Sequence, residues 1–223
     1  MHGTNSRSAG LLASLCALVS LQASAADSSP PAKPEHIRGT IESLKGEVLT
    51  VATASGPVRV RLSQSTPVAT AVQSDRAHIT DGSFLGITSV TAADGSQRAV
   101  EVHVFPEAMR GTGEGSYGWD WPGAGASQGS KMTNGTAVTS KMTNGTVTAR
   151  EGGSLTLQYK GGASGGSQAI TIPPGIPVVA IEPGRQEDLQ AGAHVFVIAT
   201  RDSEGALTAN RVLAGKNGVV PPM

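Results

Sequence analysis

The residues with the clearest potential for chemistry are Glu101 and His103, which lie two positions apart. In a β-strand, residues at this spacing point to the same face, so a carboxylate and an imidazole would lie side by side. Two such ligands can begin a weak metal site, which His36 or Asp81 would complete. The simpler interpretation, which we favour, is a solvated strand face that carries cross-strand ion pairs.

The second candidate site is the aromatic cluster Tyr117-Gly-Trp-Asp-Trp-Pro122. It holds both tryptophans and one of the two tyrosines of a chain with only 3% aromatic residues. Exposed aromatic side chains can grip a carbohydrate, a peptide or a partner protein. The alternative, which we favour, is that they plug an open barrel end or seal an interface between two units. If the cluster does bind a ligand, the candidate residues are Arg110, Glu114, Tyr117, Trp119, Asp120 and Trp121.

No enzymatic signature accompanies these candidates. Arg110-Gly-Thr-Gly-Glu-Gly115 is superficially similar to a phosphate-binding loop, but it lacks the following helix and the Lys-Ser/Thr pair. A hydrolase that pairs His78 with a serine is the weakest alternative. We therefore expect a non-enzymatic protein without a cofactor.

The charge pattern argues against nucleic acid as a partner. The formal net charge is zero, only 15% of the residues are charged, and no basic stripe is present. The electrostatic attraction that drives nucleic-acid binding is therefore missing. The expected strands also lack the aromatic platforms on which single-stranded nucleic acids stack.

The N-terminus is typical of an export signal. Residues 1–25 contain the apolar run Leu11–Leu21 followed by the small residues Ala23-Ser-Ala25. The run is too short to span a bilayer comfortably, so we expect no membrane span after cleavage. Cleavage after Ala25 also removes Cys16, the one cysteine of the chain. The mature protein is then expected in the periplasm, beginning with a flexible Pro-rich leader over residues 26–36.

Sequence matches at two fixed offsets indicate a tandem duplication. An offset of 106 pairs Gly39 with Gly145, and after a four-residue expansion an offset of 110 pairs Val102 with Val212. The matches fall on turn glycines and alternating apolar positions, where a shared fold constrains the residue type. Each copy has the pattern of five short strands with tight turns, which predicts an all-β protein.

The predicted architecture is a pair of small five-stranded OB-like barrels, with SH3-like barrels as the main alternative. The first barrel covers residues 37–105 and the second residues 146–214. A Gly-rich aromatic connector (106–145) joins them, and a tail (215–223) is expected to fray. The connector carries Ser-Lys-Met-Thr-Asn-Gly-Thr twice, at 130–136 and 140–146. We expect the second copy to lead into the second barrel, and the first to be either a lengthened linker or an added edge strand.

The connector also resembles a known family. Phe105-Pro-Glu-Ala-Met-Arg-Gly-Thr-Gly-Glu-Gly115, followed by Trp119-Asp120 and Met132-Thr-Asn134, is similar to an uncharacterised family of exported proteobacterial proteins with OB-like domains of unknown function. This chain departs from the family by carrying the Met-Thr-Asn element twice. The family brings no established activity. A link of some members to metal transport implies, as an alternative, a soluble accessory in metal handling.

These observations predict an exported, non-enzymatic binding or scaffolding module of the bacterial cell envelope. Its partner would be an unknown envelope protein or a small ligand. In the alternative, a periplasmic accessory in metal handling, the ligands would be Glu101, His103 and His36.

Overall fold

The computed structural model describes residues 33–123, 129–138, 153–161 and 165–221. The predicted signal peptide and the second copy of Ser-Lys-Met-Thr-Asn-Gly-Thr (140–146) lie outside these residues. The fold is all-β, as predicted, and no helix of the described part is long and apolar enough to cross a membrane. The described strands are β1 (Glu35–Lys45), β2 (Val48–Thr53), β3 (Gly56–Arg61), β4 (Val68–Gln73), β5 (Phe84–Thr91), β6 (Gln97–Phe105), β7 (Gly115–Trp119), β8 (Ser130–Val138), β9 (Ser154–Tyr159), β10 (Gly166–Thr171), β11 (Val178–Pro183), β12 (His194–Arg201) and β13 (Leu207–Gly215).

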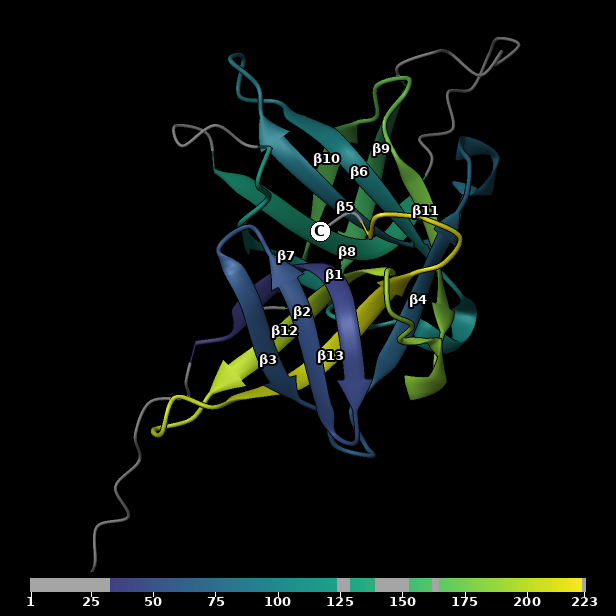
Figure 1. Cartoon of the computed structure of the whole chain (residues 1–223). Helices are drawn as coiled ribbons and strands as arrows, with labels where there is room; N and C mark the ends of the chain where they lie inside the picture. The colour runs from purple at the N-terminus through teal and green to yellow at the C-terminus, as the bar shows by residue number, and fades with distance from the viewer. Residues whose placement is uncertain (1–32, 124–128, 139–152, 162–164, 222–223) are drawn as a thin grey trace, which may run out of the picture. The chain divides into compact units, whose positions relative to one another are not determined.

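Five of these strands close a β-barrel in the order β1-β2-β3-β13-β12. All neighbours are antiparallel except β3 and β13, which run parallel with Val60 opposite Leu207. In Figure 1 the purple and blue strands β1–β3 lie beside the yellow-green β12 and β13. Alternate residues of these strands, among them Ile41, Leu49 and Val197, point inward and form the barrel core.

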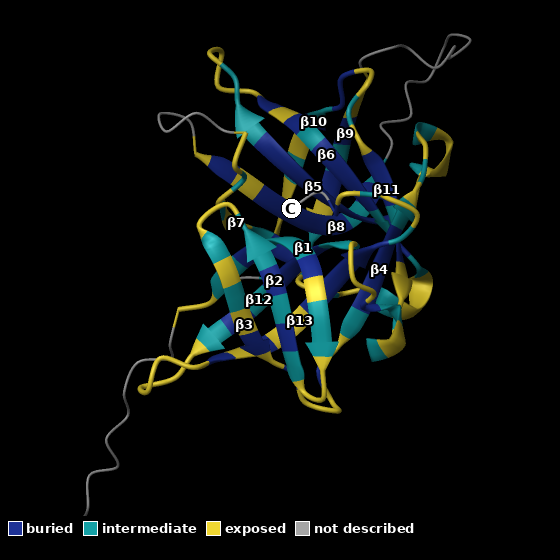
Figure 2. Ribbon diagram, viewed as in Figure 1, coloured by how far each residue is buried: buried dark blue, intermediate teal, exposed yellow. Residues whose placement is uncertain are grey.

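A second set of five strands closes in the same pattern, in the order β8-β9-β10-β6-β5. Here the parallel pair is β10 and β6, with Ile170 opposite Gln97. The core of this ring contains Leu85, Val102 and Leu157. Figure 2 shows the buried residues along the middle of the strands of both rings and the exposed residues at the turns.

Strand partners differ from those expected of two separately closed copies. Each ring takes three strands from one part of the chain and two from the other, so β12 and β13 complete the barrel of β1–β3. The first strand of the second ring is β8, which lies within the predicted connector. Periodicity in a sequence reveals which segments are strands, but it carries no information about which strand pairs with which.

β4 and β11 link the two rings. They pair with each other antiparallel, with Ala71 opposite Ile181, and each also runs parallel to the last strand of a ring, β13 or β6. The residues between the rings form a third apolar cluster, which includes all three phenylalanines of the chain: Phe84, Phe105 and Phe196.

The aromatic part of the connector is a strand. β7 pairs antiparallel with β8, with Tyr117 opposite Met132. The hydroxyl of Ser130 donates to the carbonyl of Trp119 (2.8 Å) and accepts from the amide of Trp121 (3.0 Å). These bonds hold the aromatic residues in a defined position beside the third cluster.

Two expectations about the chain ends need correction. The predicted leader, residues 26–36, ends inside β1, which begins at Glu35. The predicted tail does not fray over its described part, because the amide of Lys216 donates to the carbonyl of Ala71 (2.9 Å) and Val219 packs on the third cluster.

Candidate functional site

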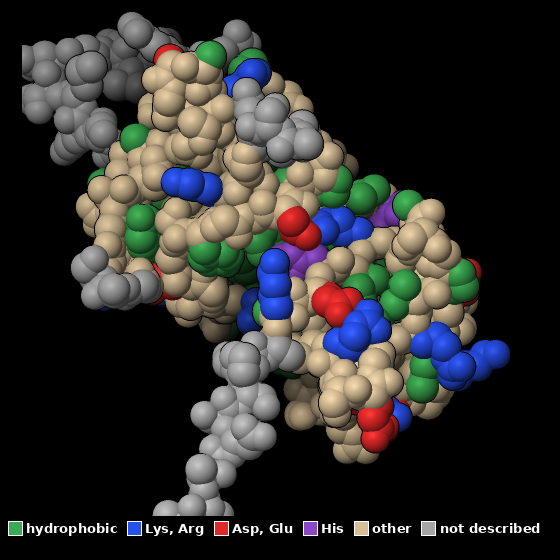
Figure 3. Space-filling model, turned by 90° about the vertical axis from the view of Figure 1, so that its left-hand side faces the viewer, with side chains coloured by type: hydrophobic (Ala, Val, Ile, Leu, Met, Phe, Trp, Pro, Cys, Tyr) green, Lys and Arg blue, Asp and Glu red, His purple; other side chains and the backbone are tan. Residues whose placement is uncertain are grey.

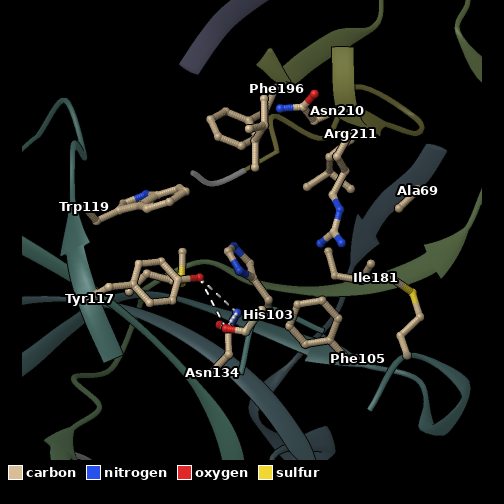
Figure 4. A pocket seen from close by; sticks show the side chains of 15 residues that line it. Ala69, His103, Phe105, Tyr117, Trp119, Asn134, Ile181, Phe196, Asn210 and Arg211 are labelled. Carbon is tan, nitrogen blue, oxygen red and sulfur yellow. Dashed lines mark hydrogen bonds between the residues drawn. The ribbon is translucent and has the colours of Figure 1, made fainter. Parts of the chain in front are cut away.

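A pocket of about 310 Å³ lies within the third apolar cluster. Its walls come from β6, β7, β8, β12 and β13, with single residues from β4 and β11. Met109 and Gly113, from the segment between β6 and β7, also line it. Figure 4 shows Tyr117 and Trp119 on one side, Phe196 and Arg211 on the opposite side, and Phe105 and His103 between them. Side chains from distant parts of the chain therefore meet around one space.

Aromatic rings form the walls of this pocket. Trp119 lies 5.9 Å from Phe196 and 6.1 Å from Tyr117, measured between ring centroids. On its outer side, Trp119 contacts the imidazole of His36 at 4.5 Å. Tyr117 is 40% exposed and marks the open side. Faces of this kind suit flat apolar groups.

Asn134 brings a polar group to the buried side of the pocket. The residue is only 6% exposed, and its Nδ2 donates to the carbonyls of Thr112 (3.3 Å) and Gly113 (3.1 Å). These two bonds fix the orientation of the amide, so that Oδ1 faces Gly86 of β5. Within the described part of the chain, Oδ1 of Asn134 and Nε1 of Trp119 are buried without a hydrogen-bond partner. Buried polar atoms are rarely left in this state, and neither atom is accessible to solvent.

Arg211 is the charged residue of the pocket. It extends from β13 toward the central space (Figure 4), and none of the ion pairs or side-chain hydrogen bonds of the described residues includes it. Burial raises the pKa of Tyr117, and the positive charge of Arg211 opposes this rise. The guanidinium and the phenol are therefore close enough to interact electrostatically.

Glu101 and His103 are buried, so the expected solvated strand face is wrong. Their exposed fractions are 2% and 0%, and His103 Nε2 lies 3.7 Å from Glu101 Oε1. The hydroxyl of Thr88 donates to the same carboxylate oxygen at 2.5 Å. Burial raises the pKa of Glu101 to about 7, although the Thr88 hydrogen bond and the charge of Arg38 oppose the rise. Both faces of β6 are covered, because one points into a barrel core and the other toward the third cluster.

His36 does not join this pair. Its Nδ1 lies 2.7 Å from Oδ1 of Asp120, and Arg38 donates to both oxygens of the same carboxylate at 2.8 and 3.2 Å. Partial burial raises the pKa of Asp120, but the hydrogen bonds from Arg38 and His36 outweigh it and hold the pKa at about 2. The described residues contain no group of three or more His, Cys, Asp or Glu side chains that could hold a metal ion.

The remaining predicted binding residues serve other contacts. Arg110 pairs with Glu107 (Nε to Oε1, 2.6 Å) and donates to the carbonyl of Gly82. Glu114 accepts a hydrogen bond from the amide of Lys160 at 2.9 Å. Trp121 lines a separate hollow together with Arg38 and Glu101. Of the six predicted residues, only Tyr117 and Trp119 line the aromatic pocket.

Sequence reasoning missed the opposite wall, Phe196 and Arg211. Phe196 lies in the apolar run of β12. Arg211 follows Asn210, and in the sequence it resembles an ordinary solvent-facing residue of a strand. No local pattern distinguishes them. They reach β7 only because β12 and β13 belong to the first ring while β7 lies on β8 of the second.

Charges of both signs are mixed on the face shown in Figure 3, where acidic, basic and histidine side chains lie together near the middle. This face offers no large patch of one charge.

Comparison with protein-family models, with curated proteins and with solved structures found no match to this chain. The pocket itself is therefore the main guide to function.

Proposed function

We propose that this protein is a non-enzymatic binding module that holds a small, largely apolar molecule in the aromatic pocket. The observation that carries the proposal is the cavity of about 310 Å³ lined by the rings of Phe105, Trp119 and Phe196. Small-molecule sites typically start at roughly 300 Å³ and combine apolar walls with a few polar groups. The pocket is large enough for one or two rings with a short chain.

The composition of the pocket favours an apolar ligand. The pocket is open on the side of Tyr117, so its apolar walls contact water when no ligand is bound. An apolar molecule that covers these walls removes apolar surface from water, which is favourable.

We further propose that the rings are OB-like barrels derived from a tandem duplication with exchanged strands. The offset of 110 maps the pair Val60–Leu207 onto Ile170–Gln97, so the two parallel closures are equivalent. It also relates Ala71 to Ile181, which lie opposite each other. Together with the export signal expected in residues 1–25, this supports a module of the cell envelope.

The experiment is a fluorescence titration of the full chain carrying Trp121→Phe, which leaves Trp119 as the one tryptophan. The probe is 3-phenylpropanamide, a neutral molecule with one ring. We expect a saturable change in Trp119 emission. Absence of saturable binding of this probe, in fluorescence and in calorimetry, would overturn the proposal.

A pocket-filling variant locates the binding. Ala69→Leu adds volume at the pocket wall, whereas Val179→Leu is the matched control at the position related by the offset of 110, which does not line the pocket. We expect Ala69→Leu to abolish the titration and Val179→Leu to retain it. Equal effects of both variants would place the probe elsewhere.

A further inference from the structure

We propose that the ligand of the aromatic pocket carries a carboxylate, and that Arg211 is its counter-ion. This inference rests on the proposed binding function and adds the chemical class of the ligand: an apolar carboxylic acid. The apolar part would lie against the rings of Trp119 and Phe196, and the carboxylate would face the guanidinium on β13.

The first argument is the charge balance of the pocket. Arg211 lines it, but no aspartate or glutamate is among the described residues that do so. Two other arginines of the molecule are engaged, since Arg38 binds Asp120 and Arg201 binds Glu35. Arg211 has no such bond within the described part of the chain, so its charge is available to an anion.

The second argument is geometry. Arg211 is exposed, and a guanidinium presents parallel N–H donors that match the two oxygens of a carboxylate. A neutral ligand of the same shape would form no ion pair with this group. The pocket therefore has a polar anchor at one side and apolar walls along the rest.

Tyr117 supplies a second donor for the same carboxylate. Its hydroxyl makes only long contacts, 3.4 Å to the carbonyl of Gly113 and 3.5 Å to Nδ2 of Asn134. Burial raises its pKa, so the phenol keeps its proton at neutral pH and can donate it in a hydrogen bond. Arg211 and Tyr117 approach from opposite walls, as Figure 4 shows, and would bracket the anion.

The test compares two probes of the same shape, 3-phenylpropanoate and 3-phenylpropanamide, on the full chain carrying Trp121→Phe at neutral pH. We expect the carboxylate to bind roughly tenfold more tightly than the amide, the ratio expected of a charge-assisted hydrogen bond. Arg211→Met should remove this preference and leave the affinity for the amide within about twofold. Arg59→Met, on an exposed arginine that does not line the pocket, is the matched control and should change neither affinity.

A further variant separates the positive charge of Arg211 from its hydrogen-bonding geometry. Arg211→Lys retains the charge without the planar fork, and it should keep a reduced preference for the carboxylate. Equal binding of both probes to the parent chain would overturn the carboxylate inference and leave the proposed binding function standing. A preference that survives Arg211→Met would overturn the role of Arg211. If neither probe binds, the proposed function itself fails.

Discussion

Trp119 of β7 and Phe196 of β12 lie with their ring centroids 5.9 Å apart. One belongs to the strand that runs along β8 of the second ring, and the other to a strand of the first ring. Their contact therefore depends on both rings being complete. The pocket that both rings line is a product of the whole fold rather than of either repeat.

The two tryptophans provide the sharpest mutational comparison. Trp119→Ala removes one wall of the pocket and should weaken 3-phenylpropanamide binding by roughly tenfold or more, because the ring contributes stacking and apolar contact. Trp121→Ala alters the separate hollow and should leave the affinity unchanged. Isothermal titration calorimetry of both variants measures the affinity for 3-phenylpropanamide. Equal losses would contradict the assignment of the pocket.

We expect the carboxylate of Asp120 to hold the end of β7 against β1. Its carboxylate accepts from Arg38 and lies against His36, and its pKa is held at about 2. Because the folded pKa lies below the unfolded value of 3.8, the stabilisation is present above pH 3.8 and is lost as pH falls through 2. Asp120→Asn should lower the free energy of unfolding at pH 7 by about 1 kcal/mol, since the pair is partly exposed.

Urea unfolding measures this loss, and amide hydrogen exchange locates it. The amides of β7 should exchange faster in Asp120→Asn than in the parent chain. Glu107→Gln, which removes the local pair with Arg110, is the control and should leave β7 exchange unchanged. Unchanged β7 exchange in Asp120→Asn would show that the carboxylate does not hold this strand.

Glu101 should make the stability of the protein fall as the pH rises. Burial raises the pKa of its carboxyl from 4.5 to about 7, so the folded state binds a proton that the unfolded state has lost. This contribution is fully present below pH 4.5 and is lost as the pH rises through 7. At about 1.4 kcal/mol per pKa unit, it amounts to about 3 kcal/mol at most.

The measurement is urea unfolding of the parent chain and of Glu101→Gln between pH 4.5 and 8. The amide cannot ionise, so the variant should lose this part of the pH dependence. Parallel stability curves over the whole range would contradict a titrating Glu101.

Gly86 should be intolerant of a side chain. A Cβ at this position would lie 2.5 Å from Oδ1 of Asn134, 3.0 Å from the ring of Phe105 and 3.3 Å from Nδ1 of His103. Gly86→Ala should therefore destabilise the protein by about 2 kcal/mol through overpacking. Gly118→Ala on β7 is the control, because its Cβ would meet open space. Chemical denaturation of both variants measures the difference in stability. Similar denaturation midpoints for the two variants would contradict the close packing around Asn134.

Strand positions were largely predictable from the sequence. In β3, for example, Val58 and Val60 alternate with arginines, which is the pattern of a half-buried strand. A 3₁₀ turn follows β4 at Arg76–His78, where the carboxylate of Asp75 accepts from the amide of Ala77. β4 is harder to detect from the sequence, because the consecutive residues Ala69–Ala71 are all buried and leave no apolar–polar alternation.

The site was predictable only in part. Tyr117 and Trp119 were predicted because aromatic residues are scarce in this chain. Arg211 was not predicted, because its position in the pocket wall depends on β13 closing the barrel of β1–β3 and facing β7 across the third cluster. Burial of Glu101 was missed for the same reason: strand alternation shows that two faces exist, and only the partners show that both are covered.

The most direct test of the binding proposal uses the methionines that line the pocket, Met109 and Met132. The full chain is labelled with ¹³C at the methionine methyl groups and titrated with 3-phenylpropanamide by NMR. We expect saturable shifts of the Met109 and Met132 signals, caused by the ring current of the bound phenyl group, while the other methionines serve as references. Saturable binding of the probe without a shift of either signal would contradict the pocket as the ligand site.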